Sequence, residues 1–202
     1  MSEKTAAPVP SNSPLILASA SPRRTQLLQE LGVAHVVRPA DIDETPRAGE
    51  PALSYVRRMA ATKAAAGVAL AGGGAVLAAD TIVVAQGQIL GKPRDRRDGL
   101  AMLARLSGCT HQVATAVCLR DGVRQSAACV TTRVSFRSVS VQEAEGYWAT
   151  GEPKDKAGGY GIQGAAANFV SRVDGSYSSV IGLPLVETRA LLCSLGLVVR
   201  LQ

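Results

Sequence analysis

The chain has 202 residues, of which 47% are hydrophobic and 19% charged, a composition typical of a globular protein with a sizeable core. It contains no run of eighteen uncharged apolar residues, so we expect no membrane-spanning helix. The net charge of +6 favours anionic partners, either nucleic acid or phosphorylated small molecules, while an aromatic content of only 3% argues against a platform for stacking bases.

Residues 1–13 are rich in Ser, Pro and Ala and lack an apolar segment, which predicts a loose N-terminal tail instead of a secretion signal. Residues 14–202 are predicted to form a single domain. The cysteines occur singly, without CxxC spacing, which indicates buried or partly buried free thiols in a reducing, cytoplasmic compartment. They are Cys109, Cys118, Cys129 and Cys193.

The domain opens with patterns for a strand, a tight turn and a helix. Residues 15–18 are apolar and predict a buried strand. Ser21 suits an N-cap and Pro22 the first helical position, and Gly32 supplies a stop for the helix. A second strand is expected over residues 34–38.

An acidic loop, residues 41–44, separates this strand from a helix that starts at Pro51. The apolar face of this helix is expected to contain Leu53, Val56, Ala60, Ala64 and Gly67. Three glycines at 72–74 end the helix. Residues 75–85 then predict a long apolar strand interrupted by the polar pair at 80–81.

The second half of the chain continues to alternate strands and helices. We expect a turn at 86–87, a short strand at 89–90 and a helix from about 100 to 108. Strands over 112–119 and 123–136, joined by a turn at 121–122, come next, followed by a helix from Ser140 capped by Glu143. The chain then continues with a glycine-rich loop over 157–164, a strand over 168–173, a helix from Pro184 and a strand over 197–201. Because helices and strands interleave without repeats, the predicted fold class is α/β with a mixed sheet.

The first candidate site is the turn before the first helix, residues 19–24, with the sequence Ser-Ala-Ser-Pro-Arg-Arg. A helix N-terminus presents unpaired N–H groups and a partial positive charge, both of which attract anions. Two hydroxyls and two guanidiniums at that position would complete a phosphate cradle, because Arg matches phosphate oxygens bidentately. An ordinary capped helix with solvated arginines is the alternative.

Two further candidates are a carboxylate and an ammonium group in apolar surroundings. Asp80 falls at the inner end of a buried strand, where a charge is costly unless it is paired or bound to a metal. It is therefore a candidate general base or Mg²⁺ ligand, the alternative being an Asp that caps a turn. Lys63 lies on the apolar face of its helix, either as a functional cation or as a snorkelling side chain.

Two glycine-containing stretches resemble nucleotide-binding motifs, but one lacks an essential residue and the other lacks the required structural context. Lys92 follows Gly91 as in a Walker A loop, but Pro93 stands where the Ser or Thr that binds Mg²⁺ belongs. Residues 159–164 match G-x-G-x-x-G, yet polar residues precede the match and a strand-like pair follows it, which argues against a dinucleotide site. We expect a loop that closes around a ligand, with Gln163 donating and accepting hydrogen bonds to a base.

These candidates together indicate phosphates held by Arg and Lys, a divalent metal held by Glu or Asp, and a water activated beside phosphorus. With two histidines and neither a G-x-S-x-G nor an H-E-x-x-H motif, a serine hydrolase or a zinc protease is disfavoured.

Six short motifs occur in a fixed order along the chain. They are residues 19–24, Asp80-Thr81, Gly91-Lys92-Pro93, Tyr160-Gly161-Ile162-Gln163-Gly164, Gly175-Ser176-Tyr177 and Val180-Ile181-Gly182-Leu183-Pro184. In this order and spacing they closely resemble the Maf-like nucleotide pyrophosphatases, from about Leu15 to about Val199. The resemblance implies a Maf/ITPase-like fold, with a mixed β-sheet flanked by helices and two lobes around a deep cleft, and often a homodimer. It also implies hydrolysis between the α and β phosphates that depends on a divalent cation, Mg²⁺ or Mn²⁺.

The resemblance also assigns roles residue by residue. Asp80 takes the place of the proton acceptor, and Glu44 matches an acidic position assigned to metal or water. The residues that match the family's phosphate side are Ser19, Arg23, Arg24, Lys63 and Lys92.

Three positions decide between two branches of the family. The branch that acts on dTTP and UTP has Arg directly after the first Pro, Thr after the catalytic Asp, and Gln in Ile-Gln-Gly. This chain has Arg23, Thr81 and Gln163. An amide suits the neutral edge of uracil or thymine, whereas the cationic base of 7-methyl-GTP, the substrate of the other branch, would suit Glu. The predicted function is hydrolysis of dTTP and UTP, or of modified pyrimidine nucleotides, to the monophosphate and diphosphate.

Three departures from the family pattern accompany this interpretation. Thr62 stands where many relatives have Glu, and residues 43–46 look more like the 7-methyl-GTP branch. Ser179 replaces a common Asn, a change expected to alter only a loop.

The alternative function is a non-catalytic nucleic-acid-binding or cell-division regulatory protein, motivated by the net charge and by the family's association with septum control. Nucleic acid is disfavoured, because a pure binder gains nothing from a buried Asp beside phosphates.

Overall fold

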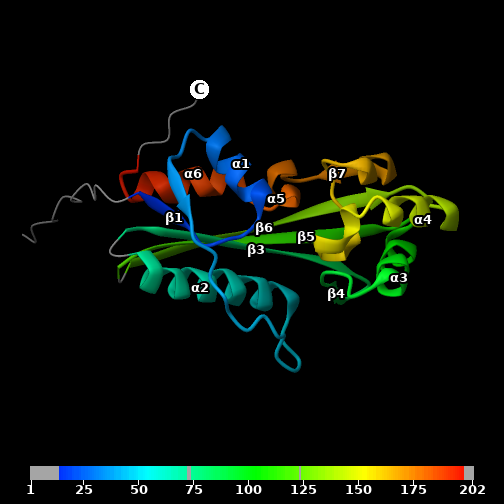
Figure 1. The fold of residues 1–202 in the computed structure, drawn as a ribbon, viewed down its shortest axis with the longest axis horizontal. Coiled ribbons are helices and arrows are strands. Elements are labelled where there is room, and N and C mark those ends of the chain that lie inside the picture. Colours follow the sequence, from blue (N-terminus) through cyan, green and yellow to red (C-terminus); the bar gives the residue numbers. More distant parts are fainter. Residues whose placement is uncertain (1–13, 72–73, 123, 198–202) are drawn as a thin grey trace, which may run out of the picture.

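A mixed sheet forms the centre of the computed structural model, which describes residues 14–71, 74–122 and 124–197 (Figure 1). The strands are β1 Leu15–Leu17, β2 His35–Val37, β3 Val76–Ala85, β4 Gln88–Leu90, β5 Thr110–Asp121, β6 Arg124–Phe136 and β7 Val170–Asp174. Their order in the sheet is β2-β1-β3-β5-β6-β7, and β4 pairs with β3. Strand β1 runs parallel to β2 and β3, whereas the other pairs are antiparallel. The predicted α/β class with a mixed sheet is confirmed.

Helices cover both faces of this sheet. The α-helices are α1 Pro22–Glu30, α2 Ala52–Ala71, α3 Arg96–Leu106, α4 Val141–Ala149, α5 Tyr177–Ile181 and α6 Leu185–Ser194, and the 3-10 helices are η1 Glu152–Asp155, η2 Ala157–Gly159 and η3 Ala165–Phe169. Helix α2 lies along one face and α1, α5 and α6 along the other, while α3 and α4 gather at one end of the sheet (Figure 1).

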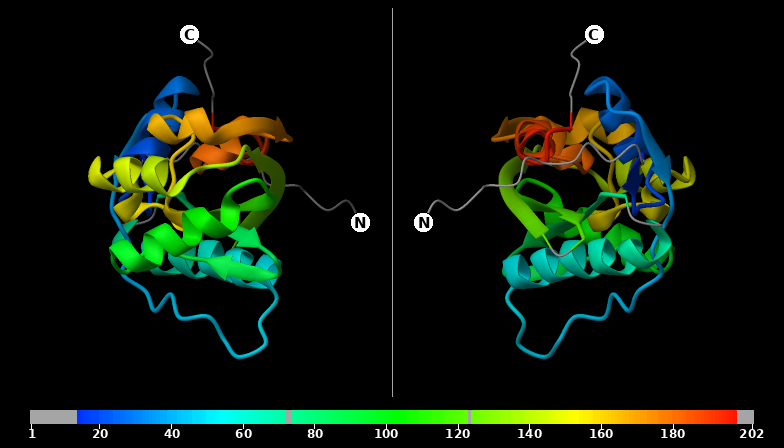
Figure 2. Two further views of the ribbon diagram at one scale, coloured as in Figure 1. Left: turned by 90° about the vertical axis from the view of Figure 1, so that its right-hand side faces the viewer. Right: turned by 90° about the vertical axis from the view of Figure 1, so that its left-hand side faces the viewer.

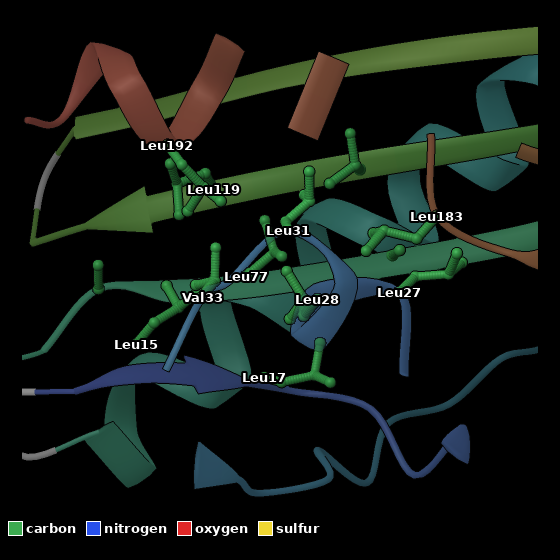
Figure 3. Packing of buried hydrophobic residues seen from close by; sticks show 13 residues of the cluster. Leu15, Leu17, Leu27, Leu28, Leu31, Val33, Leu77, Leu119, Leu183 and Leu192 are labelled. Atoms are coloured by element: carbon green, nitrogen blue, oxygen red, sulfur yellow. The ribbon is translucent and has the colours of Figure 1, made fainter. Parts of the chain in front are cut away.

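Strand β3 builds a core on each face, because successive side chains of a strand point in opposite directions. Leu77 packs on the face of α1 and α6, in a cluster that includes Leu28 and Leu192 (Figure 3). Its neighbour Val76 packs on the other face, against Met59 of α2. Burying side chains of this size stabilises the fold by about 1.5–3 kcal/mol each, so the sheet is fixed firmly between its helices.

A third apolar cluster fills the end of the sheet where α3, α4 and the glycine-rich loop meet. Phe136 lies at its centre, with ring centroids 5.1 Å from His111, 4.9 Å from Tyr160 and 6.1 Å from Phe169. His111 also shares a 2.8 Å hydrogen bond with the hydroxyl of Tyr160. These contacts attach the beginning of the glycine-rich loop to the sheet.

Three details of the predicted elements are wrong. Leu53 is 39% exposed, because it stands in the first turn of α2, before the buried positions begin at Tyr55. Strand β3 runs through Asp80 without interruption, because β5 pairs with it along this stretch, and Asp80 therefore lies in mid-strand and not at a strand end. The strand expected from residue 168 begins at Val170, because the preceding residues form η3.

The predicted helix caps are only partly present. Ser140 and Glu143 form the predicted capping box. Ser21 occupies the N-cap of α1, but its side chain makes no capping hydrogen bond. Helix α5 was not anticipated from the sequence. The tail at 1–13 lies outside the described residues, as does the strand expected over 197–201 apart from Leu197, which is not in a strand.

The described cysteines are all free: Cys118 is buried and Cys129 half-buried, but Cys109 and Cys193 are exposed, contrary to the expectation of buried thiols. Within the part of the chain that the structure describes, none of the helices is long and apolar enough to cross a membrane.

Candidate active site

A cavity of about 960 Å³ lies beside the middle of β3, between the start of α1 and the glycine-rich loop. Its volume falls at the upper end of the range for small-molecule sites. The lining includes every site residue singled out from the sequence: Ser19, Arg23, Arg24, Glu44, Lys63, Asp80, Thr81, Lys92 and Gln163. The fold therefore brings together the whole predicted set from segments far apart in the chain.

The position of the cavity follows from the strand pairing. On one edge of β3, β1 pairs only as far as Leu77, and β4 begins to pair at Val83. In the described residues, no strand pairs with this edge between those two points. Asp80 and Thr81 stand in this gap, so side chains from both faces of the sheet reach the same open space.

Asp80 points toward α2, where it meets Lys63. The Lys63 Nζ donates a 2.7 Å hydrogen bond to Asp80 Oδ1 and lies 2.8 Å from Glu44 Oε1. The side chains of Lys63 and Asp80 are 11% and 12% exposed. The alternative of a snorkelling lysine is therefore wrong, because its ammonium group is held between two carboxylates and not in water.

Glu44 belongs to the loop over residues 38–51, which extends past α2 on the side away from the sheet (Figure 2). Besides Lys63, Tyr55 and Arg58 of α2 hold this loop. The Tyr55 hydroxyl donates a 2.8 Å hydrogen bond to the Glu44 carbonyl. Arg58 donates to the Thr45 carbonyl and, at 2.6 Å, to each carboxylate oxygen of Glu50. The hydrogen bonds from Arg58 lower the pKa of Glu50 to about 2. Together with the Tyr55 contact, they anchor the loop at Glu44 and on its C-terminal side.

Arg24 points to the opposite face, where three polar groups hold it. Its Nε donates to the Gly182 carbonyl at 2.9 Å, its Nη1 to Ser19 Oγ at 2.9 Å and its Nη2 to Thr81 Oγ1 at 3.2 Å. Burial lowers the pKa of Arg24, an effect that nearby Asp80 opposes. An Arg side chain has five N–H donors, so two remain to face an anion in the cavity.

Thr115, which the sequence did not single out, continues this hydrogen-bond chain to Ser179. The Thr115 hydroxyl lies 3.0 Å from Thr81 Oγ1 and donates a 2.7 Å hydrogen bond to the Ser179 carbonyl. Since the only hydrogen of Thr115 is used there, Thr81 must donate to Thr115 and accept from Arg24. Ser179 joins this network only through its main-chain carbonyl. It is buried in helix α5, so the expectation that it lies in a loop is wrong.

The remaining predicted residues lie at the rim of the cavity. Lys92 and Gln163 are exposed there, and Arg23 lies 3.6 Å from Asp155. The stretch that matches G-x-G-x-x-G overlaps η2 and leads into η3, instead of joining a strand to a helix. This geometry excludes a dinucleotide-binding turn, as expected.

Glu44 and Asp80 are carboxylates of the cavity that could hold a divalent metal ion. Among the described residues, no cluster of three or more His, Cys, Asp or Glu could hold a metal ion. Glu44 and Asp80 nevertheless share one cation, the Lys63 ammonium. Mg²⁺ is commonly held by one or two carboxylates together with substrate phosphates and water, so this pair fits a metal that arrives with a nucleotide.

Comparison with known proteins agrees with this geometry. The family model described as Maf-like protein matches residues 14–195. The chain belongs to the Maf-like family. A relative from Methylococcus capsulatus is 51% identical over 184 residues, covering 91% of each chain. One from an Anaeromyxobacter species is 52% identical over 187 residues, covering 90% of this chain and 89% of the relative. A third, from Hahella chejuensis, is 50% identical over 191 residues, covering 93% and 95%. Each of the three is named dTTP/UTP pyrophosphatase.

Membership of the Maf-like family explains why weak motifs predicted a whole site. Neither the turn at Ser19 nor the lysine at Lys92 identified a function by itself. The structure shows them lining the cavity that also contains Asp80. Thr115, Tyr55 and Arg58 escaped notice because they orient other site residues from positions that carry no motif.

Proposed function

We propose that this Maf-like protein hydrolyses dTTP and UTP between the α and β phosphates, releasing the nucleoside monophosphate and pyrophosphate. The observation that carries the proposal is the Asp80–Lys63 pair facing the same cavity as the Arg24 guanidinium. Relatives about half identical to the chain, named dTTP/UTP pyrophosphatase, support the choice of substrate.

The phosphates are bound by the positive groups of the cavity. Ser19 and Arg24 are already joined by a hydrogen bond, so the guanidinium is fixed before substrate arrives. Arg23 and Lys92 approach from the rim. Such preorganised donors stabilise the negative charge that builds up on the phosphates during the reaction.

Asp80 acts as the proton acceptor. A water molecule attacks the α phosphorus, the bond between that phosphorus and the α–β bridging oxygen breaks, and pyrophosphate leaves. The water's proton passes to the Asp80 carboxylate. Lys63 holds this carboxylate in place through its 2.7 Å hydrogen bond to Oδ1.

Glu44 and Asp80 would hold a divalent cation, Mg²⁺ or Mn²⁺, together with the substrate phosphates. When bound, such a cation neutralises phosphate charge and polarises the phosphoryl oxygens. The loop contacts of Tyr55 and Arg58 keep Glu44 beside Asp80 for this purpose.

The base is read by Gln163, with Thr81 and Arg23 as the other residues that set specificity. An amide both donates and accepts hydrogen bonds, which matches the alternating acceptor and donor atoms on the edge of uracil and thymine.

We place this activity in the cytoplasm, where free nucleotides occur and where free thiols persist. A homodimer, which the family resemblance implies, is tested by sedimentation.

The experiment that tests the reaction is hydrolysis of dTTP in ¹⁸O-labelled water with Mg²⁺. The proposal predicts dTMP and pyrophosphate, with the label in dTMP because water attacks the α phosphorus. Label in the pyrophosphate would place the attack on the β phosphorus. Release of dTDP and inorganic phosphate would contradict the proposed cleavage altogether.

A further inference from the structure

One carboxylate, that of Glu152, holds both ends of the turn that presents Gln163. Its Oε2 accepts a 3.0 Å hydrogen bond from the Ala165 N–H. Its Oε1 accepts a 2.8 Å hydrogen bond from the Tyr147 hydroxyl, whose oxygen in turn accepts the Gly161 N–H at 3.1 Å. Gln163 stands between these two anchored amides.

The turn is packed directly onto this carboxylate. It is closed by a 3.1 Å hydrogen bond from the Gly164 N–H to the Gly161 carbonyl. A Cβ atom on Gly164 would lie 2.2 Å from Glu152 Oε1. The φ of Gly164 is −106°, outside the left-handed region, so the close contact with Glu152 is the main reason for a glycine there. Any side chain at this position would displace the Glu152 carboxylate.

Glu152 and Tyr147 together form a clamp at the end of α4. The Thr150 hydroxyl donates to the Tyr147 carbonyl at 2.7 Å and accepts from the Glu152 N–H at 3.2 Å. The Tyr147 ring is 4% exposed and stands edge-on to Phe169, with centroids 5.4 Å apart. Burial raises the pKa of Tyr147, so its hydroxyl keeps the proton that it donates to Glu152.

We propose that Tyr147 and Glu152 are positioning residues for base recognition, acting through the backbone of the 161–165 turn to fix the amide of Gln163. This inference rests on the proposed function, since it assumes that Gln163 contacts a pyrimidine. The base is bound alike in the ground state and the transition state, so loosening the turn weakens binding of the whole nucleotide and leaves the chemical step unchanged.

The test uses Tyr147→Phe and Glu152→Gln in the full-length protein, with Glu145→Gln as the matched control. Glu145 is on the same helix α4, but its carboxylate pairs with Arg96 at the surface. Steady-state kinetics give KM and kcat for UTP, dTTP and CTP. Inhibition by inorganic tripolyphosphate, which has phosphates but no base, reports on the phosphate side alone. Thermal unfolding shows that each variant is folded.

Each clamp variant should raise KM for UTP and dTTP by about tenfold, the worth of one good hydrogen bond. We expect kcat to change by less than about threefold, discrimination of UTP against CTP to fall, and the inhibition constant of tripolyphosphate to stay the same. The control should match the wild type in every measurement.

Two results would overturn the inference. Unchanged KM values in both folded variants would show that the clamp does not position Gln163. An equal loss of affinity for tripolyphosphate would show a general structural role. A wild-type protein that hydrolyses none of these nucleotides would contradict the proposed function instead. The clamp would then be judged by calorimetric binding of UTP, which both variants should weaken and the control should not.

Discussion

The Nζ of Lys63 lies 2.7 Å from Oδ1 of Asp80, and both side chains are almost fully buried. Lys63 belongs to helix α2, which covers the sheet, and Asp80 belongs to strand β3 of the sheet. Removing Lys63 from this arrangement is expensive, because Asp80 and Glu44 would both lose the cation that they share. The pair therefore fixes the carboxylate at the centre of the cavity.

Replacing Asp80 with Asn should remove catalysis without removing substrate binding. The amide has nearly the same shape but cannot accept the proton from water. We expect pyrophosphate release from UTP to fall by about 10²- to 10⁴-fold, the usual contribution of a positioned base. Asp121→Asn, at the end of β5, serves as the control. A folded Asp80→Asn protein with normal turnover would show that Asp80 is not the proton acceptor.

Replacing Lys63 with Met should leave Asp80 and Glu44 facing each other without a cation. We expect the free energy of unfolding at pH 7.5 to drop by about 3 kcal/mol, the usual cost of breaking a buried pair. Adding Asp80→Asn to this variant should recover part of the loss, because the amide needs no counter-charge. Urea unfolding of the two single variants and the double variant measures this coupling. Strictly additive effects would show that the two residues do not interact.

Replacing Thr115 with Val should disturb Arg24 at a distance. The change keeps the shape of the side chain but removes the acceptor of the Thr81 hydroxyl and leaves the Ser179 carbonyl unpaired. We expect a loss of about 1–3 kcal/mol in the free energy of unfolding and a fall of about tenfold in kcat/KM for UTP. Thr115→Ser keeps the hydroxyl and should retain both properties. Equal unfolding free energies and equal kcat/KM values in the Val and Ser variants would show that the Thr115 hydroxyl does not position Arg24.

Acid should destabilise the protein through His111. Burial lowers the pKa of His111 to about 4, against about 6.5 in the unfolded chain. Between these values the unfolded state binds more protons than the folded state. The free energy of unfolding therefore falls as the pH drops below 6.5, by about 2 kcal/mol between pH 7.5 and pH 5. Urea unfolding of the wild type and His111→Gln at both pH values tests this. An equal decrease in the two proteins would assign the effect to other groups.

Much of the fold and nearly all of the site could be predicted from local sequence. The apolar run before the turn at Ser19 and the long apolar run of β3 define buried strands, because such patterns depend on burial alone. The capping box at Ser140 depends only on residues three positions apart. Most of the predicted cavity residues were found because they stand in one of the six motifs. Lys63 was found from its place on the apolar face of a helix, and Glu44 from the family resemblance.

What escaped prediction depends on contacts between distant residues. Thr115 matters because β5 pairs with β3 in a register that places it opposite Thr81. Glu152 matters because the chain returns to it thirteen residues later at Ala165. The position of Asp80 in mid-strand likewise follows from the partner strand and not from the residues beside it. Register and loop packing are tertiary properties that no local pattern encodes.

Hydrolysis of pyrimidine nucleoside triphosphates in this cavity can be tested directly. The most direct test is to incubate the wild-type protein with Mg²⁺ or Mn²⁺ and each of dTTP, UTP, CTP, 7-methyl-GTP and the common purine triphosphates, and to measure pyrophosphate release. We predict the highest kcat/KM for dTTP and UTP. A clear preference for 7-methyl-GTP, or no pyrophosphate from any nucleotide, would contradict this account.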